Sequence, residues 1–382
     1  MGKVLGIIGG GQLGLMLTEA SKKFPSEISE VIVLDPTIEC PASKAGAKQI
    51  VADFKDKNAI IDLASKSDIL TYEIESGDSN VLKSIEDKTL INPSPDTLKK
   101  IQDKLVQKIF LSKNGLPVAD FEKIISLDDL KDKVRKFGFP CLLKTRRGAY
   151  DGRGNFKITS DDEVSKAYQQ FEGQEMMLEK LVDFRMEVSV IAARNTHGKI
   201  AAYPLVENIH EENILKITIA PARVSDVIAQ KARDVAKKTM EVLKGAGVFG
   251  IEMFVTKDDQ ILINEIAPRV HNSGHHTIQS SKTSQFEQHL RSILGLELGS
   301  TELLYSTVMY NILGPKNFKG EYKPIEIDSE EGVFLKMYGK KESKPNRKLG
   351  HINIIDVNNS GNIDALLDKI ETIKKSIHFR AA

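Results

Sequence analysis

Two glutamates have a spacing that could hold a metal ion. The segment 248–266 reads as a β-hairpin, and with Asp258 and Asp259 as a two-residue loop, Glu252 and Glu265 would face one another on adjacent strands. Cross-strand partners have Cβ atoms about 5 Å apart, where two like charges are destabilising unless a cation neutralises them. Mg²⁺ prefers one or two carboxylates together with nucleotide phosphates, so the pair suits a magnesium–nucleotide site. Two solvated glutamates on an edge hairpin are the alternative.

A lysine on an apolar strand precedes a mobile basic loop. Lys144 lies in the apolar run 141–145, and the following segment 146–155 contains three glycines and three arginines. Glycines let backbone N–H groups wrap a phosphate, and a lysine supplies a point charge for it. The Gly-Lys-Ser/Thr ending of a Walker A loop is absent. A phosphate-binding loop and a flexible solvated hairpin both fit this composition.

A glycine-rich turn near the start matches the dinucleotide fingerprint. Gly9, Gly11 and Gly14 follow the apolar run 4–8 and open a helix over 12–23, and Asp35 ends the next strand. Glycines allow close approach of an anion to the N–H groups at a helix N-terminus. This physics does not identify the anion. A structural tight turn, an NAD(P) site and a site for another phosphorylated ligand all remain open.

Another polar feature lies on two strands between the lysine strand and the glutamate hairpin. The apolar strand 176–182 is interrupted by Glu179 and Lys180, and the alternation that follows places Arg185, Glu187 and Ser189 on one face. Alone this pattern is typical of a half-exposed strand. Beside the other two features, it could form the adenine and ribose wall of a cleft.

Alternating strands and helices must position the glycine-rich turn. Apolar runs at 4–8, 31–34, 69–72 and 89–92 are separated by helical segments, a pattern typical of an open α/β sheet. Ser94 and Pro95 then begin a helix with an apolar stripe of Leu98, Ile101, Leu105 and Ile109, which we take as the boundary of the first domain.

The rest of the chain reads as α+β. Strands are expected at 141–145, 156–159, 176–181 and 187–193, and helices at 161–172, 226–244 and 284–294, the last with a capping box and a terminal glycine. Residues 301–382 look β-rich, with a final helix at 364–376. The fold class is therefore a multidomain combination of α/β and α+β.

Length and charge limit the function classes. A chain of 382 residues implies two or three domains, and 54 Lys plus Arg against 53 Asp plus Glu give a net charge of +1. This balance provides no global field for nucleic acid or an anionic membrane surface. Cys40 and Cys141 are too few for a disulfide framework, and the apolar runs are too short for a membrane span. The first residues lack a signal-peptide pattern, so we expect a cytoplasmic protein.

Four segments taken in order resemble the ATP-grasp superfamily: 144–154, 179–182, 249–252 and 264–275. Within it, they resemble the family of 5-(carboxyamino)imidazole ribonucleotide synthases of purine biosynthesis, and the segments 283–289 and 338–351 extend the resemblance over nearly the whole chain. It implies an ATP-grasp fold with a Rossmann-like (pre-ATP-grasp) domain at 1–103, a small lid subdomain at 104–185, a large subdomain at 186–300 and a small β-rich domain at 301–382.

The resemblance also implies a reaction. ATP, bicarbonate and 5-aminoimidazole ribonucleotide would give the carboxyamino product, ADP and phosphate through a carboxyphosphate intermediate. ATP and Mg²⁺ would be the cofactors, the partners would be small molecules rather than nucleic acid or membrane, and the enzyme would be a homodimer.

Site residues follow from the resemblance position by position. Arg269, Lys144 and Arg153 would be catalytic, and Glu252 and Glu265 would bind the metal. The ATP site would consist of phosphate-binding lysines, a phosphate-covering loop and residues around adenine and ribose: Lys104, Lys144, Ala149, Tyr150, Asp151, Gly152, Arg153, Gly154, Asn155, Glu179, Lys180, Leu181, Val182, Glu187, His210, Asn264 and Glu265. The ribonucleotide would lie among Gly10, Gly11, Gln12, Leu13, Glu73, Arg269, His271, Asn272, Ser273, Gly274, His275, Lys340 and Arg347.

Three positions depart from the family pattern. Val270 stands where the family usually has proline, Ala149 replaces a glycine, and Ser76 replaces an asparagine. None of these changes removes a group that the chemistry demands. Two competing functions remain: another ATP-grasp enzyme, such as the formate-using glycinamide ribonucleotide transformylase, and an NAD(P)-dependent dehydrogenase. The second rests on the glycine-rich turn and Asp35 alone and leaves Lys144, Glu252 and Glu265 unexplained.

Overall fold

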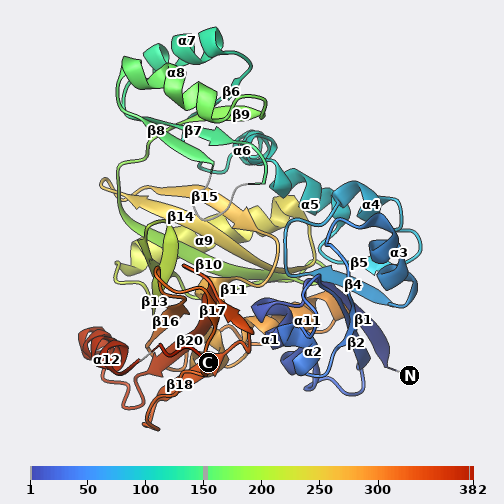
Figure 1. The fold of residues 1–382 in the computed structure, drawn as a ribbon. Helices are drawn as coiled ribbons and strands as arrows, with labels where there is room; N and C mark the ends of the chain where they lie inside the picture. Colours follow the sequence, from blue (N-terminus) through green and yellow to red (C-terminus); the bar gives the residue numbers. More distant parts are fainter. Residues whose placement is uncertain (1, 149–153, 378) are drawn as a thin grey trace.

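A computed structural model describes residues 2–148, 154–377 and 379–382 (Figure 1). The N-terminal part is a five-stranded parallel sheet in the order β3-β2-β1-β4-β5, with helices between the strands. This confirms the expected open α/β sheet. The elements are β1 (Lys3–Ile8), α1 (Gln12–Ser21), β2 (Ile28–Leu34), α2 (Pro41–Lys44), β3 (Lys48–Ile50), α3 (Lys57–Ser65), β4 (Ile69–Tyr72), α4 (Ser79–Lys83) and β5 (Leu90–Ile91).

The sequence predicts one helix after Ser94, and this prediction is wrong, because the structure has two helices there. α5 (Pro95–Gln102) and α6 (Lys104–Lys113) are separated at Asp103, which has extended backbone angles and caps α6 by accepting from the N–H groups of Leu105 and Val106. An aspartate at this position competes with the helix for backbone donors, which explains the break. The same break leaves Ile109 exposed at 37% instead of on an apolar stripe.

A small four-stranded antiparallel sheet in the order β6-β9-β7-β8 stands apart from the body of the molecule at the top of Figure 1. Two helices, α7 (Leu127–Phe137) and α8 (Asp161–Gln170), pack on it, and α7 was not expected from the sequence. The strands are β6 (Phe121–Ile124), β7 (Cys141–Thr145), β8 (Asn155–Ile158) and β9 (Met176–Lys180).

The body is built on one large antiparallel sheet in the order β15-β14-β10-β12-β13-β16-β20-β18, with β11 paired to β10. The strands of 301–382 extend this sheet through the pairing of β13 with β16. Its elements are β10 (Phe184–Arg194), β11 (Ile200–Ala202), β12 (Val206–Glu211), β13 (Ile214–Ala220), α9 (Asp226–Leu243), β14 (Gly247–Thr256), β15 (Ile261–Ala267), η1 (Asn272–Gly274), α10 (Thr277–Ser280), α11 (Gln285–Leu294), β16 (Thr307–Leu313), β17 (Gly320–Glu321), β18 (Val333–Met337), β19 (Glu342–Ser343), β20 (Lys348–Ile355) and α12 (Ile363–Ser376).

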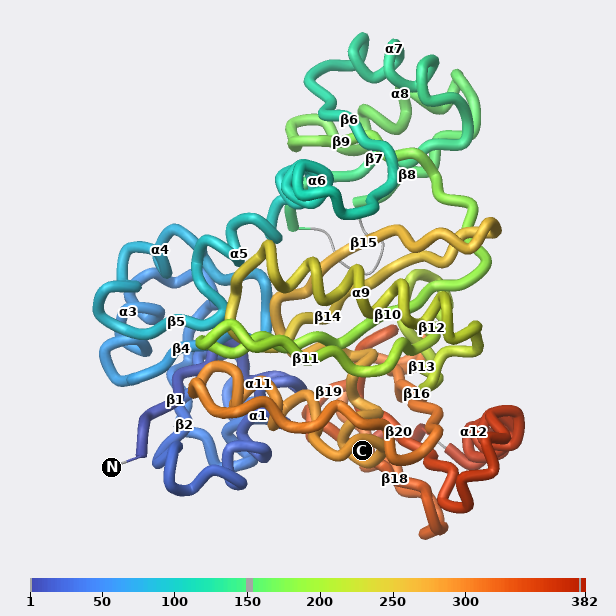
Figure 2. Tube along the Cα trace, turned by 180° about the vertical axis from the view of Figure 1, so that it is seen from behind, coloured from blue at the N-terminus to red at the C-terminus, as the bar shows by residue number. Residues whose placement is uncertain are grey.

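Helices on the two faces of this sheet connect it to the rest (Figure 2). Ile228, Ala232 and Met240 of α9 share one apolar cluster with Val190 and Ile251 of the sheet. On the other side, α11 lies between the sheet and α1, so one core spans the N-terminal part and the body. This shared core fixes the glycine-rich turn before α1 relative to the glutamate hairpin.

Four histidines are buried in the body and neighbouring elements without a paired acid. Burial lowers the pKa of His276 and His289 to about 3, and burial with the nearby charge of Lys336 does the same for His351. Burial also holds the pKa of His275 well below its usual value. His289 Nε2 lies 2.8 Å from the hydroxyl of Thr71, and its Nδ1 accepts from the N–H of Val248. These rings are therefore neutral parts of the core.

The buried histidines predict acid sensitivity. Unfolded histidines titrate near 6.5, whereas the pKa of folded His276 is lowered to about 3, so between these values the unfolded chain binds more protons and stability falls as pH falls. Each such histidine contributes a slope of about 1.4 kcal/mol per pH unit. We expect His276→Asn to reduce the pH dependence of the free energy of unfolding, measured by denaturant titration at pH 4–6, by about that amount. The exposed His197→Asn is the control, and an unchanged slope in His276→Asn would contradict the assignment.

Candidate active site

The hairpin of β14 and β15 places two glutamates opposite one another. Glu252 pairs with Glu265, as the sequence predicts, but the prediction of a two-residue loop is wrong. The loop contains three residues, 257–259, with Asp259 in the left-handed region at φ 60°, and nearer the turn Met253 pairs with Ile263. A β-bulge at Asn264 inserts one extra residue and restores the pairing of the glutamates.

Each of these glutamates contacts a nitrogen donor. Glu265 Oε2 lies 2.8 Å from Lys104 Nζ, and Glu252 Oε1 lies 3.1 Å from His271 Nε2. Burial alone would raise the pKa of Glu252, but the hydrogen bond and charge of His271, with the charges of His210 and Lys104, lower it to about 2. The hairpin therefore presents two carboxylates, and their oxygens are the hard ligands that Mg²⁺ accepts.

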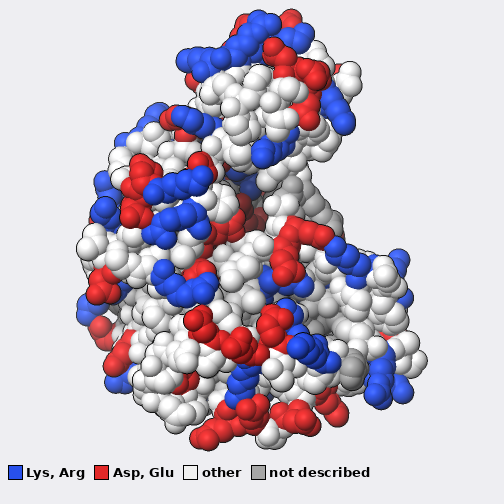
Figure 3. All heavy atoms as spheres, turned by 90° about the vertical axis from the view of Figure 1, so that its left-hand side faces the viewer, with Lys and Arg blue, Asp and Glu red and all other residues white. Residues whose placement is uncertain are grey.

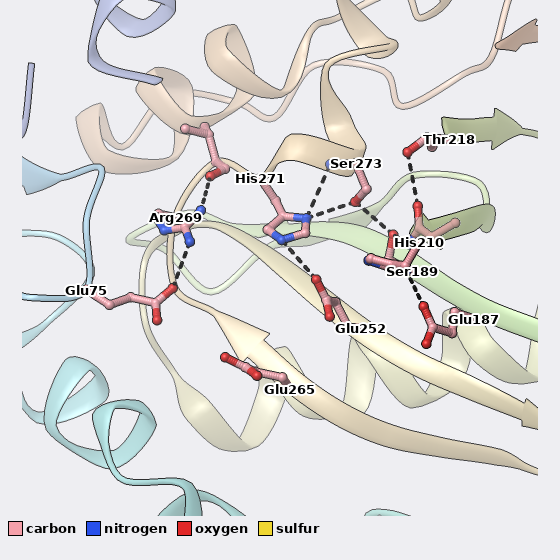
Figure 4. Close-up of polar contacts among 12 residues, drawn as sticks. Glu75, Glu187, Ser189, His210, Thr218, Glu252, Glu265, Arg269, His271 and Ser273 are labelled. Atoms are coloured by element: carbon pink, nitrogen blue, oxygen red, sulfur yellow. Dashed lines mark hydrogen bonds and ion pairs between the residues drawn. The ribbon is translucent and has the colours of Figure 1, made fainter. Parts of the chain in front are cut away.

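A chain of hydrogen bonds across the sheet fixes His271 (Figure 4). The hydroxyl of Thr218 donates to the amide oxygen of Asn208, and the amide NH₂ of Asn208 donates to the hydroxyl of Ser189. The hydroxyl of Ser189 in turn donates to the hydroxyl of Ser273 at 2.8 Å. The hydroxyl and the backbone N–H of Ser273 both face Nδ1 of His271, so Nε2 carries the hydrogen that Glu252 accepts. The sequence places Ser189 on the polar face of its strand, whereas Asn208 and Thr218 were missed.

Arg269 lies beside the hairpin with one acidic partner. Its Nη2 is 3.1 Å from Glu75 Oε1, and its Nη1 donates to the carbonyl of Val270 (Figure 4). Burial raises the pKa of Glu75, while the charge of Arg269 opposes that shift. Nε of Arg269 is buried and has no hydrogen-bond partner among the described residues. The guanidinium is thus oriented but incompletely satisfied, which suits an oxyanion ligand.

A cavity at the edge of the hairpin collects the basic residues. Figure 3 shows the molecule hollowed between the lobe at the top and the body, with charged side chains inside the hollow. The cavity brings three lysines together with two carboxylates and two amides: Lys104, Gln107, Lys108, Lys144, Glu179, Asn264 and Glu265. Gln107 and Lys108 were not predicted as site residues, although their spacing of three and four residues from Lys104 predicts a shared helix face.

A second, less polar cavity adjoins the first. Phe184 and Phe254 stack with ring centroids 4.6 Å apart and close one side of it. The cavity is lined by Leu142, Lys144, Glu179, Lys180, Leu181, Val182, Phe184 and Phe254. An apolar floor beside the strand end at 180–182 suits a flat heteroaromatic ring. The sequence indicated 179–182 but not the two phenylalanines, which come from different strands.

Glu187 and His210 lie together on neighbouring strands of the large sheet. Their side chains form an ion pair through Glu187 Oε2 and His210 Nδ1. Burial would lower the pKa of His210, but the hydrogen bond and charge of Glu187, with the charge of Glu252, raise it. Glu187, expected at the ribose, and His210, expected near the nucleotide, are therefore in contact, on the face that also carries Ser189.

The glycine-rich turn already contains an anion from the protein itself. Glu73 accepts from the N–H of Gly11 at 2.6 Å and from those of Leu13 and Gly14 at 3.0 Å. Asp35 accepts from the N–H of Gly10. Glu73 occupies the position that the dinucleotide fingerprint gives to a pyrophosphate, and the acid that would bind a ribose is already bonded to the turn. This arrangement contradicts an NAD(P) site at the turn.

The C-terminal part reaches this turn through Lys340. Its Nζ donates to the side-chain oxygen of Gln12 at 2.6 Å and to the carbonyl of Lys348 at 2.7 Å. Burial, reinforced by the charge of Arg347, lowers the pKa of Lys340 to about 7. Arg347 donates to the carbonyl of Glu342. Lys340 and Gln12, which are 328 residues apart in the sequence, are thereby brought into one site.

The side chain of Gln285 holds the histidine-rich loop 271–275. Gln285 accepts from the N–H of His271 and donates to its carbonyl, and Gly274 packs against the same side chain. Both side-chain polar atoms of Asn272 are buried without a hydrogen-bond partner among the described residues. His275 points into the body, where its ring packs on His351 at 4.9 Å. Asn272 is thus the better placed of the two for a ligand.

Part of the predicted phosphate-covering loop lies outside the described residues: Ala149, Tyr150, Asp151, Gly152 and Arg153. At its ends, Asn155 pairs with Lys144 across β7 and β8, and the carbonyl of Gly154 accepts from the N–H of Thr145. Arg146 and Arg147 at its base both contact the buried Asp103. Those two arginines join the loop to the start of α6.

Comparison with known proteins agrees with this geometry. Three family models match in order: a ribonucleotide synthetase preATP-grasp domain at 1–102, an ATP-grasp domain at 109–286 and a phosphoribosylaminoimidazole carboxylase C-terminal domain at 307–362. The chain is 40% identical to N5-carboxyaminoimidazole ribonucleotide synthase of Bacillus subtilis over 93% of its own length and 92% of that protein.

Solved structures show the same similarity over full length. The N5-carboxyaminoimidazole ribonucleotide synthetase of Thermotoga maritima matches with a TM-score of 0.88 and 43% identity, covering 100% of both chains. The synthase of Aspergillus clavatus in complex with ADP and 5-aminoimidazole ribonucleotide matches with a TM-score of 0.85 and 33% identity, covering 97% of this chain and 99% of that one.

The carboxylate in the glycine-rich turn gives a testable stability prediction. In Glu73→Gln the side chain keeps one acceptor oxygen and turns an NH₂ group toward backbone N–H donors, so at least one buried donor loses its acceptor. We expect a loss of about 1–3 kcal/mol in the free energy of unfolding, measured with denaturant. The exposed Glu39→Gln should change it by less than about 0.5 kcal/mol. Equal stabilities of the two variants would refute the role of Glu73.

Proposed function

The chain belongs to the family of N5-carboxyaminoimidazole ribonucleotide synthases, ATP-grasp ligases of purine biosynthesis, and we propose how its residues divide that reaction. The reaction is the ATP-dependent carboxylation of 5-aminoimidazole ribonucleotide. The observation that supports this reaction best is that the nucleotide cavity and the region of Arg269 and His271 meet at the hairpin. The nucleotide cavity lies on one side of Glu265 and Lys104, and on the other side Arg269 and His271 lead toward the glycine-rich turn with Lys340.

ATP binds across the two adjoining cavities in this proposal. Adenine lies on the apolar floor of Phe184 and Phe254 beside 180–182, and the ribose hydroxyls reach Glu187. The phosphates lie among Lys104 and Lys144 at the end of the hairpin. Asn264 lines the same cavity, and the loop 149–155 covers the phosphates. Such positioning with charge neutralisation supplies most of the catalysis in phosphoryl transfer.

Glu252 and Glu265 are the proposed ligands of Mg²⁺. Their donor set fits, because both are carboxylates on one face of the hairpin, where Lys104 contacts Glu265 and His271 contacts Glu252. The ion would neutralise charge on the phosphoryl group in transfer. With Mg²⁺ on Glu265, the ammonium of Lys104, which lines the same cavity, would be available to the phosphates.

Arg269 and His271 lie where bicarbonate would be activated. The planar fork of Arg269 suits the oxyanions of a carboxyphosphate intermediate and of the phosphate that leaves it. His271 is oriented by Ser273 and Glu252 and therefore presents a fixed ring edge to the site. Water must be excluded here, because it would hydrolyse the intermediate before the amine attacks it.

The ribonucleotide is proposed to lie between the glycine-rich turn and the 271–275 loop. Lys340 and Arg347 would bind its phosphate, and Gly10, Gly11, Gln12 and Leu13 would border it. The contact between Lys340 and Gln12 supports this placement. Glu73 stays bound to the backbone of the turn and contributes negative charge toward the amino group of the aminoimidazole.

The formate-using transformylase shares the nucleotide machinery but is not favoured. The segment 307–362 matches the C-terminal domain of phosphoribosylaminoimidazole carboxylases, and this region supplies Lys340 and Arg347. Cytoplasmic location and a homodimer also remain proposals. Free, buried thiols at Cys40 and Cys141 suit a reducing compartment, and no helix in the described ranges is long and apolar enough to cross a membrane.

The proposal predicts substrate-dependent phosphate release. Purified protein with ATP and Mg²⁺ should release phosphate at a rate that rises at least about tenfold when 5-aminoimidazole ribonucleotide and bicarbonate are both present, because closure and carboxyl transfer require them. Glycinamide ribonucleotide with formate is the comparison. Turnover that is independent of 5-aminoimidazole ribonucleotide, or that prefers the second pair, would overturn the proposed function.

The metal assignment predicts the behaviour of Glu265→Gln. Loss of one anionic ligand should reduce kcat/KM for ATP by at least about a hundredfold and raise the Mg²⁺ concentration that gives half-maximal turnover. Lys104→Met removes the partner of Glu265 and should raise the KM for ATP without that shift in Mg²⁺ dependence. Glu241→Gln, at an exposed position of α9, is the control. Normal turnover and Mg²⁺ dependence in Glu265→Gln would exclude it as a metal ligand.

A further inference from the structure

Lys108 is a buried cation in the nucleotide cavity to which the proposed reaction gives no role. Its side chain is 4% exposed, and its Nζ lies 3.1 Å from Glu179 Oε2. The same Nζ donates to the carbonyl of Ile263 at 3.1 Å. Ile263 precedes the bulge at Asn264, and its N–H donates to the carbonyl of Pro117. Lys108 thus connects α6, β9 and β15.

Two lysines share the single carboxylate of Glu179. Oε1 accepts from Lys144 Nζ at 2.8 Å, and Oε2 contacts Lys108. Glu179 is 3% exposed, and burial would raise its pKa, but the charges of Lys144 and Lys108 lower it. A buried carboxylate without a cation is strongly destabilising, so at least one lysine must stay with Glu179.

The two lysines differ in how they are held. Lys108 has a second bond to the protein backbone and is packed within α6. Lys144 lines both cavities, and the only partner of its Nζ in the described ranges is Glu179. Lys144 can therefore turn toward phosphate, whereas Lys108 cannot leave without breaking its bond to Ile263.

We propose that Lys108 is a positioning residue that keeps Glu179 neutralised while Lys144 transfers its ammonium from Glu179 to the phosphates of ATP. The proposal rests on the nucleotide site of the proposed function. With Lys108 present, Glu179 retains one cation in both states. Without it, departure of Lys144 leaves Glu179 as an isolated buried charge, so binding of the phosphates has to overcome that cost.

The test is the affinity for a non-hydrolysable ATP analogue with Mg²⁺, measured by calorimetry. We expect Lys108→Met to raise the Kd at least about tenfold, which corresponds to about 1.4 kcal/mol. Lys113→Met, at an exposed position on the same helix, should bind like the wild type. An unchanged Kd in a folded Lys108→Met variant would overturn the proposal.

A double variant separates neutralisation of charge from packing. When Glu179→Gln removes the carboxylate, Lys108 has no charge to balance, so Lys108→Met/Glu179→Gln should bind within about threefold of Glu179→Gln alone. A further loss of about tenfold in the double variant would show a role independent of Glu179 and overturn the proposal. This comparison also decides the matter if Lys108→Met alone fails to fold.

The two proposals fail in different ways. Absence of analogue binding by the wild-type protein would refute the nucleotide site itself. Normal wild-type binding with an unaffected Lys108→Met variant would refute only the role of Lys108. Binding without ribonucleotide-dependent phosphate release would refute the proposed reaction and leave the role of Lys108 intact.

Discussion

The backbone of Ile263 is the contact on which the nucleotide site depends. Its N–H donates to the carbonyl of Pro117 and its carbonyl accepts from Lys108, so a strand of the large sheet is joined to the segment that leads into the small sheet. These bonds occur where the bulge at Asn264 interrupts the pairing of β14 and β15. The bulge in turn sets Glu265 opposite Glu252. One local irregularity therefore fixes both the pair of Glu252 with Glu265 and the segment that leads into the small sheet.

Charged side chains around that contact are paired with side chains of opposite charge or with hydrogen-bond partners. Lys104 pairs with Glu265, Lys108 and Lys144 share Glu179, Arg269 pairs with Glu75, and His271 contacts Glu252. A site with so many buried ions is stable only if each charge has a partner before substrate arrives. Binding of a phosphorylated substrate then exchanges partners instead of creating pairs. The cavity is accordingly close to balanced in charge, because two carboxylates line it together with three lysines.

Sequence reasoning succeeded where a pattern repeats and failed where distant segments meet. The register of an assumed two-residue loop predicted the pairing of Glu252 with Glu265, and the pairing is correct because a longer loop and a bulge compensate for one another. Asp103, which breaks the helix by capping α6, also binds Arg146, 43 residues away, and no local pattern reveals that contact. The phenylalanine stack and the hydrogen bonds from Thr218 to Ser273 likewise join separate strands. Lys108 was detectable from its spacing to Lys104, yet its spacing alone does not distinguish a cavity from a solvated helix face.

The glycine-rich turn shows why a motif needs its surroundings before it indicates a ligand. Glycine is required there for close packing, because a Cβ at Gly14 would lie 2.6 Å from the carbonyl oxygen of Gly9 and one at Gly10 would lie 2.4 Å from the sulfur of Cys40. The donors that would bind a pyrophosphate are satisfied by Glu73. A carboxylate so placed stabilises the N-terminus of α1 and at the same time repels a phosphate from it. A phosphorylated substrate beside this turn must therefore find its positive charge elsewhere, and the cation that reaches the turn is Lys340, at its contact with Gln12.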